Sequence, residues 1–229
     1  MKDSMKNIQK ALITMIAIVG LTTNVSAFEG FSVGAVYSQN DFSTSGVETT
    51  GAAGGTGNTH STPITKSGSA DIGSIFAEYT FSQGSTIGID YIDGSAEVAK
   101  ASRTSSTPAG TVTASADISD PITFYVEPTF MMNEKFGIYV KGGVTQMTIT
   151  PKEVDAASVT TSTYTAKDLN GVLTGFGAKL YLGESFFVKA EYQEVDYATY
   201  EHRSTTGELN SISANLDTEE TRFALGYNF

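Results

Sequence analysis

Apolar and polar side chains alternate along most of this chain, and this alternation predicts β-strands. Residues 221–229 show the pattern most clearly, because large apolar side chains occupy every second position and would share one face of a strand. These side chains belong to Phe223, Leu225, Tyr227 and Phe229. A strand with one apolar face needs a sheet to join and an apolar surface to contact. The same pattern predicts eight strands, at residues 30–41, 70–81, 86–98, 117–131, 136–150, 168–182, 186–200 and 221–229.

The connections between these strands alternate strictly between long and short. Four long connections are rich in Ser, Thr, Ala and Gly, which is typical of loops; they span residues 42–68, 99–116, 151–167 and 201–217. Three short turns span residues 82–85, 132–135 and 183–185. An up-and-down barrel would place all short turns at one rim and all long loops at the other. Bacterial outer-membrane barrels have this asymmetry, with periplasmic turns and extracellular loops.

The fold predicted from this rhythm is all-β: an eight-stranded antiparallel up-and-down transmembrane β-barrel. A soluble barrel of lipocalin type has no reason to segregate its loops, and its apolar residues line the inside. In a bilayer the sheet must close, because an unpaired edge would leave backbone groups without hydrogen bonds in hydrocarbon. We therefore expect the last strand to pair with the first.

Charged residues occur on the strand faces opposite the apolar ones. At about 3.3 Å per residue and a tilt of about 40°, they would lie on the order of 10 to 18 Å above the rim with the short turns. A Lys or Arg that faced lipid at this depth would cost about 2 to 4 kcal/mol, so these residues should face the lumen. The predicted lumen charge network has four acids and four bases: Glu78, Asp90, Glu127, Lys141, Lys179, Lys189, Glu191 and Arg222.

The lumen should be packed. An eight-stranded barrel is only wide enough for side chains to fill it, and five aromatic residues share the inward parity. These are Phe76, Tyr125, Tyr139, Tyr181 and Phe187. Two interpretations of the charges remain: they keep the lumen polar and fix the strand register, or they form a narrow, gated ion path.

The first 27 residues have the three parts of a secretory signal peptide. Lys2, Lys6 and Lys10 precede an apolar run, and Val25-Ser26-Ala27 supplies small residues for cleavage. The apolar run is about half the roughly 20 residues that a transmembrane helix needs. We expect residues 1–27 to be removed and residues 28–229 to form the outer-membrane barrel domain.

Composition narrows the class further. The chain has 14 Lys and Arg against 25 Asp and Glu, which argues against nucleic acid as a partner. It has no cysteine, so an exported form cannot depend on disulfides.

These features together resemble the small outer-membrane β-barrel family, similar to the transmembrane domain of outer membrane protein A, over essentially all of residues 28–229. The resemblance implies that the barrel-assembly machinery reads the terminal strand, whose assembly signal would be Phe223, Leu225, Tyr227 and Phe229. It also implies outer-membrane lipids and lipopolysaccharide as surroundings, with both termini periplasmic. Trp is absent, so the aromatic girdles would consist of Tyr and Phe.

Motifs for catalysis, cofactors and metals are weak. His60 and His202 lie beside hydroxyl residues in predicted loops, where a solvated histidine is the ordinary interpretation. We expect no catalytic residues, no cofactor and no metal site. Acids of the fourth loop and its end could attract divalent cations, but exposed charge is the simpler interpretation; they are Glu201, Glu208, Asp217, Glu219 and Glu220.

The predicted function is that of an integral outer-membrane protein with a structural or surface-interaction role, carried by long polar extracellular loops. The alternatives are a narrow pore or small-solute transporter, a soluble exported binding module, and a lipid-modifying or proteolytic enzyme. The sequence names no extracellular ligand.

Overall fold

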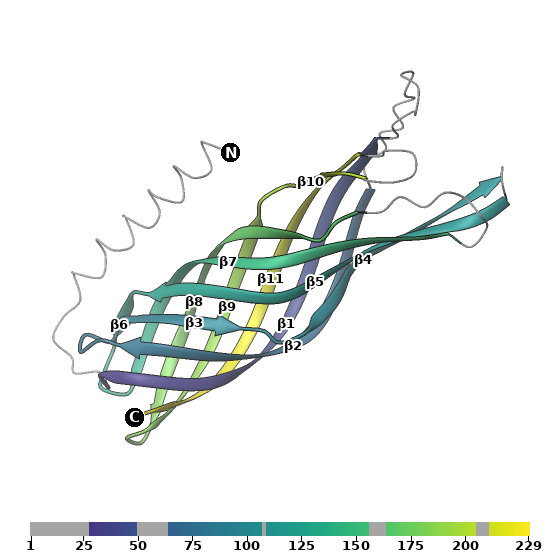
Figure 1. Ribbon diagram of the computed structural model, residues 1–229. Coiled ribbons are helices and arrows are strands. Elements are labelled where there is room, and N and C mark those ends of the chain that lie inside the picture. Colours follow the sequence, from purple (N-terminus) through teal and green to yellow (C-terminus); the bar gives the residue numbers. More distant parts are fainter. Residues whose placement is uncertain (1–27, 50–63, 107–108, 156–163, 205–210) are drawn as a thin grey trace.

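The protein is described by a computed structural model that covers residues 28–49, 64–106, 109–155, 164–204 and 211–229. The predicted signal peptide, residues 1–27, lies outside the described residues, as does His60. Within the described ranges, no helix is long and apolar enough to cross a membrane. All regular structure there is β-sheet (Figure 1).

In the described part of the chain, eleven strand segments make up eight barrel strands, because β4, β6 and β10 continue β3, β5 and β9. The segments are β1 (Gly30–Thr49), β2 (Ile64–Thr80), β3 (Thr86–Tyr91), β4 (Ser95–Ser106), β5 (Ala109–Glu127), β6 (Thr129–Met131), β7 (Phe136–Asp155), β8 (Lys167–Leu182), β9 (Phe186–Tyr197), β10 (Tyr200–Arg203) and β11 (Ser211–Asn228). Their order confirms the predicted all-β, eight-stranded, up-and-down topology.

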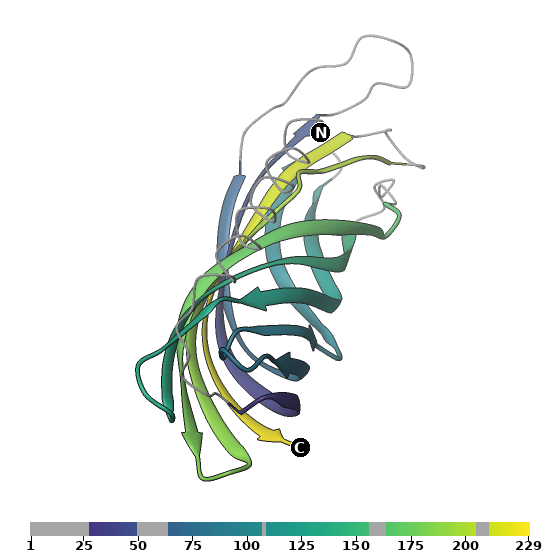
Figure 2. The same cartoon turned by 90° about the vertical axis from the view of Figure 1, so that its left-hand side faces the viewer.

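The sheet closes on itself through antiparallel pairing of β1 with β11, from Ser32 opposite Asn228 to Thr49 opposite Ser211. This confirms the predicted pairing of the first and last strands. The short turns and the C-terminus gather at one end of the barrel, at the lower left of Figure 1 and the bottom of Figure 2. We call this the short-turn end.

The outer face of the barrel is apolar. Phe31, Ile75 and Phe176 are each more than 60% exposed, whereas inward neighbours on the same strands are buried. Along β8 the outward positions from Val172 to Leu182 span about 25 Å, the height of the apolar band of an outer-membrane barrel. An exposed apolar surface of this height suits contact with the hydrocarbon core of a bilayer.

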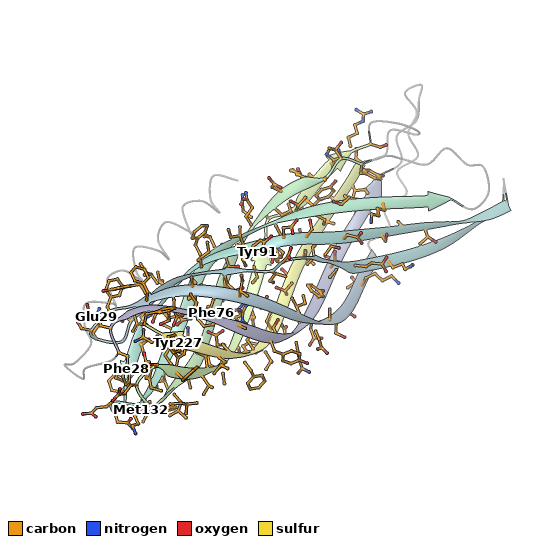
Figure 3. The ribbon with its side chains drawn as sticks, turned by 60° about the horizontal axis from the view of Figure 1, so that its bottom comes forward. Phe28, Glu29, Phe76, Tyr91, Met132 and Tyr227 are labelled. Carbon is orange, nitrogen blue, oxygen red and sulfur yellow. The ribbon has the colours of Figure 1, made fainter. Side chains whose placement is uncertain are left out.

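Tyrosines mark the two borders of this apolar band. Tyr227 lies toward the short-turn end, together with Met132, and Tyr91 lies farther along the barrel (Figure 3). Tyr227 also packs edge-on against Phe186 and Phe229, with ring centroids 5.1 Å apart in both pairs. Tyr and Phe thus supply an aromatic girdle in a chain that has no Trp.

The strands extend much farther than the side-chain pattern predicts. Residues assigned to the first loop continue the β1–β2 ladder as far as Gly46 opposite Ile64, and the second predicted loop forms the hairpin of β4 and β5. Ladder hydrogen bonds use backbone groups, so runs of Ser, Thr and Gly can pair once the neighbouring strand is in register. The predicted loop boundaries are therefore wrong, although the alternation of short and long connections holds.

Candidate functional site: the lumen charge network

Seven of the eight barrel strands direct a charged side chain of the predicted network into the lumen. Successive side chains of a strand point to opposite faces of the sheet, so each of these charged residues points inward while an apolar neighbour in the chain points outward. β1 contributes no charge to the network, as predicted. The structure buries all eight predicted residues to between 0% and 6% exposure: Glu78, Asp90, Glu127, Lys141, Lys179, Lys189, Glu191 and Arg222.

One half of the network is centred on Lys189. Its Nζ lies 2.5 Å from Glu78 Oε2 and 2.8 Å from Glu127 Oε2, so one ammonium group joins two carboxylates. Glu78 binds a second cation through its other oxygen, with Lys179 Nζ at 2.8 Å from Oε1. Tyr125 donates its hydroxyl hydrogen to Glu78 at 3.0 Å. The carboxylate of Glu78 therefore has three donors in a buried site.

The other half is centred on Glu191. Lys141 Nζ lies 3.1 Å from Glu191 Oε1 and 3.5 Å from Glu127 Oε1, which links the two halves. Tyr139 donates to Glu191 at 2.7 Å, and Arg222 Nε lies 3.3 Å from Glu191 Oε2. All eight predicted residues thus belong to one connected chain of alternating charge. It ends at an ion pair between Arg222 and Asp90.

Arg222 also binds an acid that the sequence did not assign to the lumen. Its Nη1 lies 3.1 Å from Glu220 Oε2, and Gln193 Nε2 donates to the same oxygen at 2.8 Å. Glu220 is 8% exposed, so its description as an exposed loop acid is wrong. The missed signal was parity, because Glu220 precedes Arg222 by two positions on the same strand face.

With Glu220 included, the network has five carboxylates against four cations. The predicted balance of four and four is therefore wrong by one acid. Each cation still contacts at least one carboxylate, as burial of a charge requires.

Aromatic rings fill the space around the charges. Lys141 Nζ lies 4.3 Å from the ring centre of Tyr125, and Lys179 Nζ lies 4.6 Å from that of Phe187. The five aromatic residues predicted to face inward are all buried to 5% exposure or less. These rings exclude water beside the ammonium groups and attract them through the ring quadrupole.

Glycines allow the rings to lie flat against the barrel wall. Gly34 faces Phe76, and Gly226 faces Phe187, as direct cross-strand partners. A Cβ on Gly226 would lie 2.2 Å from the Phe187 ring, and one on Gly34 would lie 2.4 Å from the Phe76 ring. The glycines of these strands thus make room for the aromatic filling of the lumen.

Two apolar layers enclose the charged one. Toward the short-turn end, Phe187, Tyr181 and Met131 form a buried cluster against which Phe28 packs. Toward the opposite end lies a larger cluster that includes Phe42, Met147 and Leu216. Within the described residues the charge network is thus sealed from both ends of the barrel.

The terminal strand presents its predicted assembly residues to the outside. Phe223, Leu225, Tyr227 and Phe229 are between 39% and 76% exposed. This placement is what a lipid-facing recognition strand requires, and the signalling role itself remains a prediction.

His202 contacts a backbone amide and two tyrosine rings. Its Nε2 accepts the backbone N–H of Thr165 at 3.4 Å, and its ring lies between those of Tyr164 and Tyr200. A ring nitrogen that accepts a backbone hydrogen bond is occupied as a base. This arrangement gives no support to a catalytic role for His202.

The chain matches a protein-family model over most of its length. The family model described as "Outer membrane protein beta-barrel domain" matches residues 11–229. No curated protein matches the sequence. Among solved structures, OprG of Pseudomonas aeruginosa is 13% identical, with 90% of this chain and 99% of that chain covered and a TM-score of 0.48.

Two further solved structures are similar at the same level. The outer membrane protease OmpT of Escherichia coli is 10% identical, with 88% and 97% covered and a TM-score of 0.46. Neisserial surface protein A is 13% identical, with 86% and 99% covered and a TM-score of 0.44.

Proposed function

Because this chain belongs to the outer-membrane β-barrel family, we propose that it is a sealed, lipid-embedded scaffold that presents its long strands at the cell surface. One observation carries the proposal: a connected network of buried ion pairs crosses the lumen, with Glu127 and Lys179 at 0% and 1% exposure. At the level of the network, a lumen filled in this way holds the barrel wall in register and leaves no path for a solute through the barrel.

The charges favour a structural role over an ion path. An ion can pass through a lumen only where water or movable side chains make way for it. Lys189 and Glu191 are each held by several partners, so they do not move aside easily. Removing one partner of such a buried pair leaves an uncompensated charge, so rearrangement is costly.

The surface role belongs to the strands beyond the apolar band. There, outward positions change from apolar to polar and acidic; on the wall formed by β1, β9 and β11 these positions include Asp41, Glu194, Asp196, Asp217 and Glu219. Polar strand extensions of this kind suit contact with water, lipopolysaccharide head groups or another surface.

Residues 1–27 act in this proposal as a cleaved signal peptide, and the terminal strand with Phe229 is read by the barrel-assembly machinery. Both termini of the mature chain then lie in the periplasm. Mass spectrometry of the purified membrane protein should give an N-terminus at Phe28.

Labelling of engineered cysteines tests the orientation, since the native chain has none. Ser45 in β1 and Ser82 in the β2–β3 turn are both exposed, at opposite ends of the barrel. A membrane-impermeant maleimide should label Ser45→Cys on intact cells, and Ser82→Cys only after the outer membrane is permeabilised. The reverse pattern, or equal labelling of both, would contradict a surface role for the long strands.

A further inference from the structure

On the side away from the short turns, the lumen next to the charge network is apolar. The structural role of the network does not require an apolar lumen there. A buried cluster fills it, built from inward residues of β1, β5, β7, β8, β9, β10 and β11. Its largest members include Phe42, Met147 and Tyr200, exposed by 4%, 1% and 2%. The part of the barrel beyond the network therefore has an apolar interior.

A cavity of about 190 Å³ lies at the outer end of this apolar part, with the exposed Lys66 and Lys100 at its edge. Ile149, Leu169 and Leu216 of the cluster line it, together with Ala116. The volume is below the roughly 300 to 1,000 Å³ of pockets for drug-sized ligands, and it equals about six water molecules. It suits a single narrow hydrocarbon chain and is too small for a lipid with several chains.

Tyr200 brings an unsatisfied polar group to the cavity. Its side chain lines the cavity and is 98% buried, and its hydroxyl has no hydrogen-bond partner within the described part of the chain. Buried hydroxyl groups are normally paired. A ligand with a hydrogen-bond acceptor at one end of an apolar chain would supply the missing partner.

Two lysines line the same cavity, Lys66 of β2 and Lys100 of β4. A third, Lys167, has its Nζ 5.9 Å from the ring centre of Tyr200 and donates to the backbone carbonyl of Glu201 at 3.3 Å. Lys66 and Lys100 are solvent-exposed, and Lys100 has only a loose contact of 3.7 Å with Glu97. Apolar walls beside cations complement an anionic amphiphile.

A gap in the barrel wall offers a way in. β2 pairs with β3 only as far as Ile75 opposite Tyr91, and the rest of its edge has no partner in β4 among the described pairings. β4 instead follows β5 away from the barrel, toward the right of Figure 1. A pocket of about 370 Å³ occupies this gap and reaches Ile118 of the apolar cluster.

We propose that this cavity binds a single-chain anionic amphiphile of medium length, such as a free fatty acid. Its tail lies among the apolar residues, and its carboxylate accepts hydrogen bonds from the Tyr200 hydroxyl and from Lys66 and Lys100. The gap beside β4 opens just beyond Tyr91, at the border of the apolar band, where such a molecule would arrive from the bilayer. This ligand site goes beyond the scaffold role and does not depend on it.

Binding of radiolabelled decanoate and decanol to the full barrel in lipid nanodiscs tests the proposal, with empty nanodiscs as background. Wild type should bind both in a saturable manner. Lys66→Gln with Lys100→Gln should weaken decanoate binding by about tenfold, as loss of charge-assisted hydrogen bonds implies, and leave decanol binding within about twofold. Tyr200→Phe should weaken binding of both, and Ala116→Leu, which fills the cavity, should abolish it.

Lys135→Gln and Tyr192→Phe are the matched controls, because both residues lie outside the cavity, and neither should change binding. Each variant must first show the heat-modifiable gel shift of a folded barrel. Absence of saturable decanoate binding by folded wild type would overturn the proposal. Binding that survives Ala116→Leu would overturn the location, and equal loss of decanoate and decanol in the lysine variant would overturn the anionic head group. Failure of the scaffold role would appear separately, in the cysteine labelling.

Discussion

At the scale of single residues, Lys189 connects two carboxylates of the charge network. It bridges Glu78 and Glu127, and its side chain is 2% exposed. We expect Lys189→Met to lower the free energy of unfolding by about 3 to 5 kcal/mol, because it leaves two buried carboxylates without their shared cation. Urea titration of the barrel in vesicles, read by the gel shift, measures the change.

Lys135→Met provides the control, since Lys135 is exposed in the turn before β7. It should change the free energy of unfolding by less than about 0.5 kcal/mol. Adding Glu127→Gln to Lys189→Met should restore part of the loss, because it removes one of the stranded charges. Equal stability of the two lysine variants would show that the network does not stabilise the barrel.

The Phe187 ring leaves no space for a side chain at Gly226. A Cβ there would lie 2.2 Å from Phe187, so Gly226→Ala should cost about 1 to 3 kcal/mol through overpacking. At Gly73 the nearest atom to an added Cβ is 3.9 Å away. Gly73→Ala should therefore be neutral or stabilise by up to about 1 kcal/mol in the same urea titration. A neutral Gly226→Ala would contradict the tight filling of the lumen.

Asp217 lies directly opposite Asp196 on the polar outer wall of β9 and β11. Burial and the neighbouring Asp196 raise the pKa of the Asp217 carboxyl, so the folded barrel binds this proton more readily than the unfolded chain does. The stability contribution is therefore present at low pH and is lost as pH rises through the raised pKa.

We accordingly expect Asp217→Asn to stabilise the barrel at neutral pH by about 0.2 to 1 kcal/mol, by removing a like-charge pair. The gain should disappear near pH 3, where the carboxyl is protonated in either state. Urea titrations at the two pH values measure it. A gain of the same size at both would mean that the charge repulsion is not its source.

Residue parity in the strands was enough to predict the eight network members from the sequence. It did not find Glu220, because the predicted strand began at Thr221, whereas β11 begins at Ser211, and the prediction placed this acid in a loop. Nor could parity identify which acid binds which base, since pairing depends on neighbouring strands that only the closed sheet brings together. Arg222 contacts Asp90 of β3, which comes near β11 only because β1 pairs with β11.

At the scale of elements, strand order and closure followed from alternation and connection length, whereas strand length did not. The hairpin of β4 and β5 has the composition of a loop, and its backbone ladder depends on register rather than on side chains. The apolar cluster around Phe42 and Tyr200 was missed for the same reason, because both residues fell at or beyond the ends of the predicted strands.

The terminal strand β11 carries the proposed assembly signal. Deletion of Phe229 should lower the amount of heat-modifiable barrel in the outer membrane, because it removes the last outward aromatic of the proposed assembly signal. Deletion of residues 50–63, between β1 and β2, should leave that amount intact, since it removes no described strand. Membrane fractionation followed by gels of boiled and unboiled samples compares the two. Normal assembly without Phe229 would remove the proposed signal.

At the scale of the whole molecule, the barrel combines an apolar outside with a filled inside. Lipid covers the exposed ring formed by residues such as Phe31 and Phe223, and the closed β1–β11 pairing leaves no free edge at that depth. The aromatic layer around Phe187, the charge network and the apolar cluster follow one another along the lumen. A molecule built in this way supports extended strands at one surface without offering a path between its ends.

Single-channel recording in planar bilayers measures this sealing most directly. Folded wild-type barrel should give no conductance steps. Arg222→Ala removes the side chain that joins Asp90, Glu191 and Glu220, and should introduce brief openings or lower the stability of the barrel. Stable conductance steps from wild type, with a size altered by Arg222→Ala or Lys141→Ala, would contradict the account and favour an ion path through the lumen.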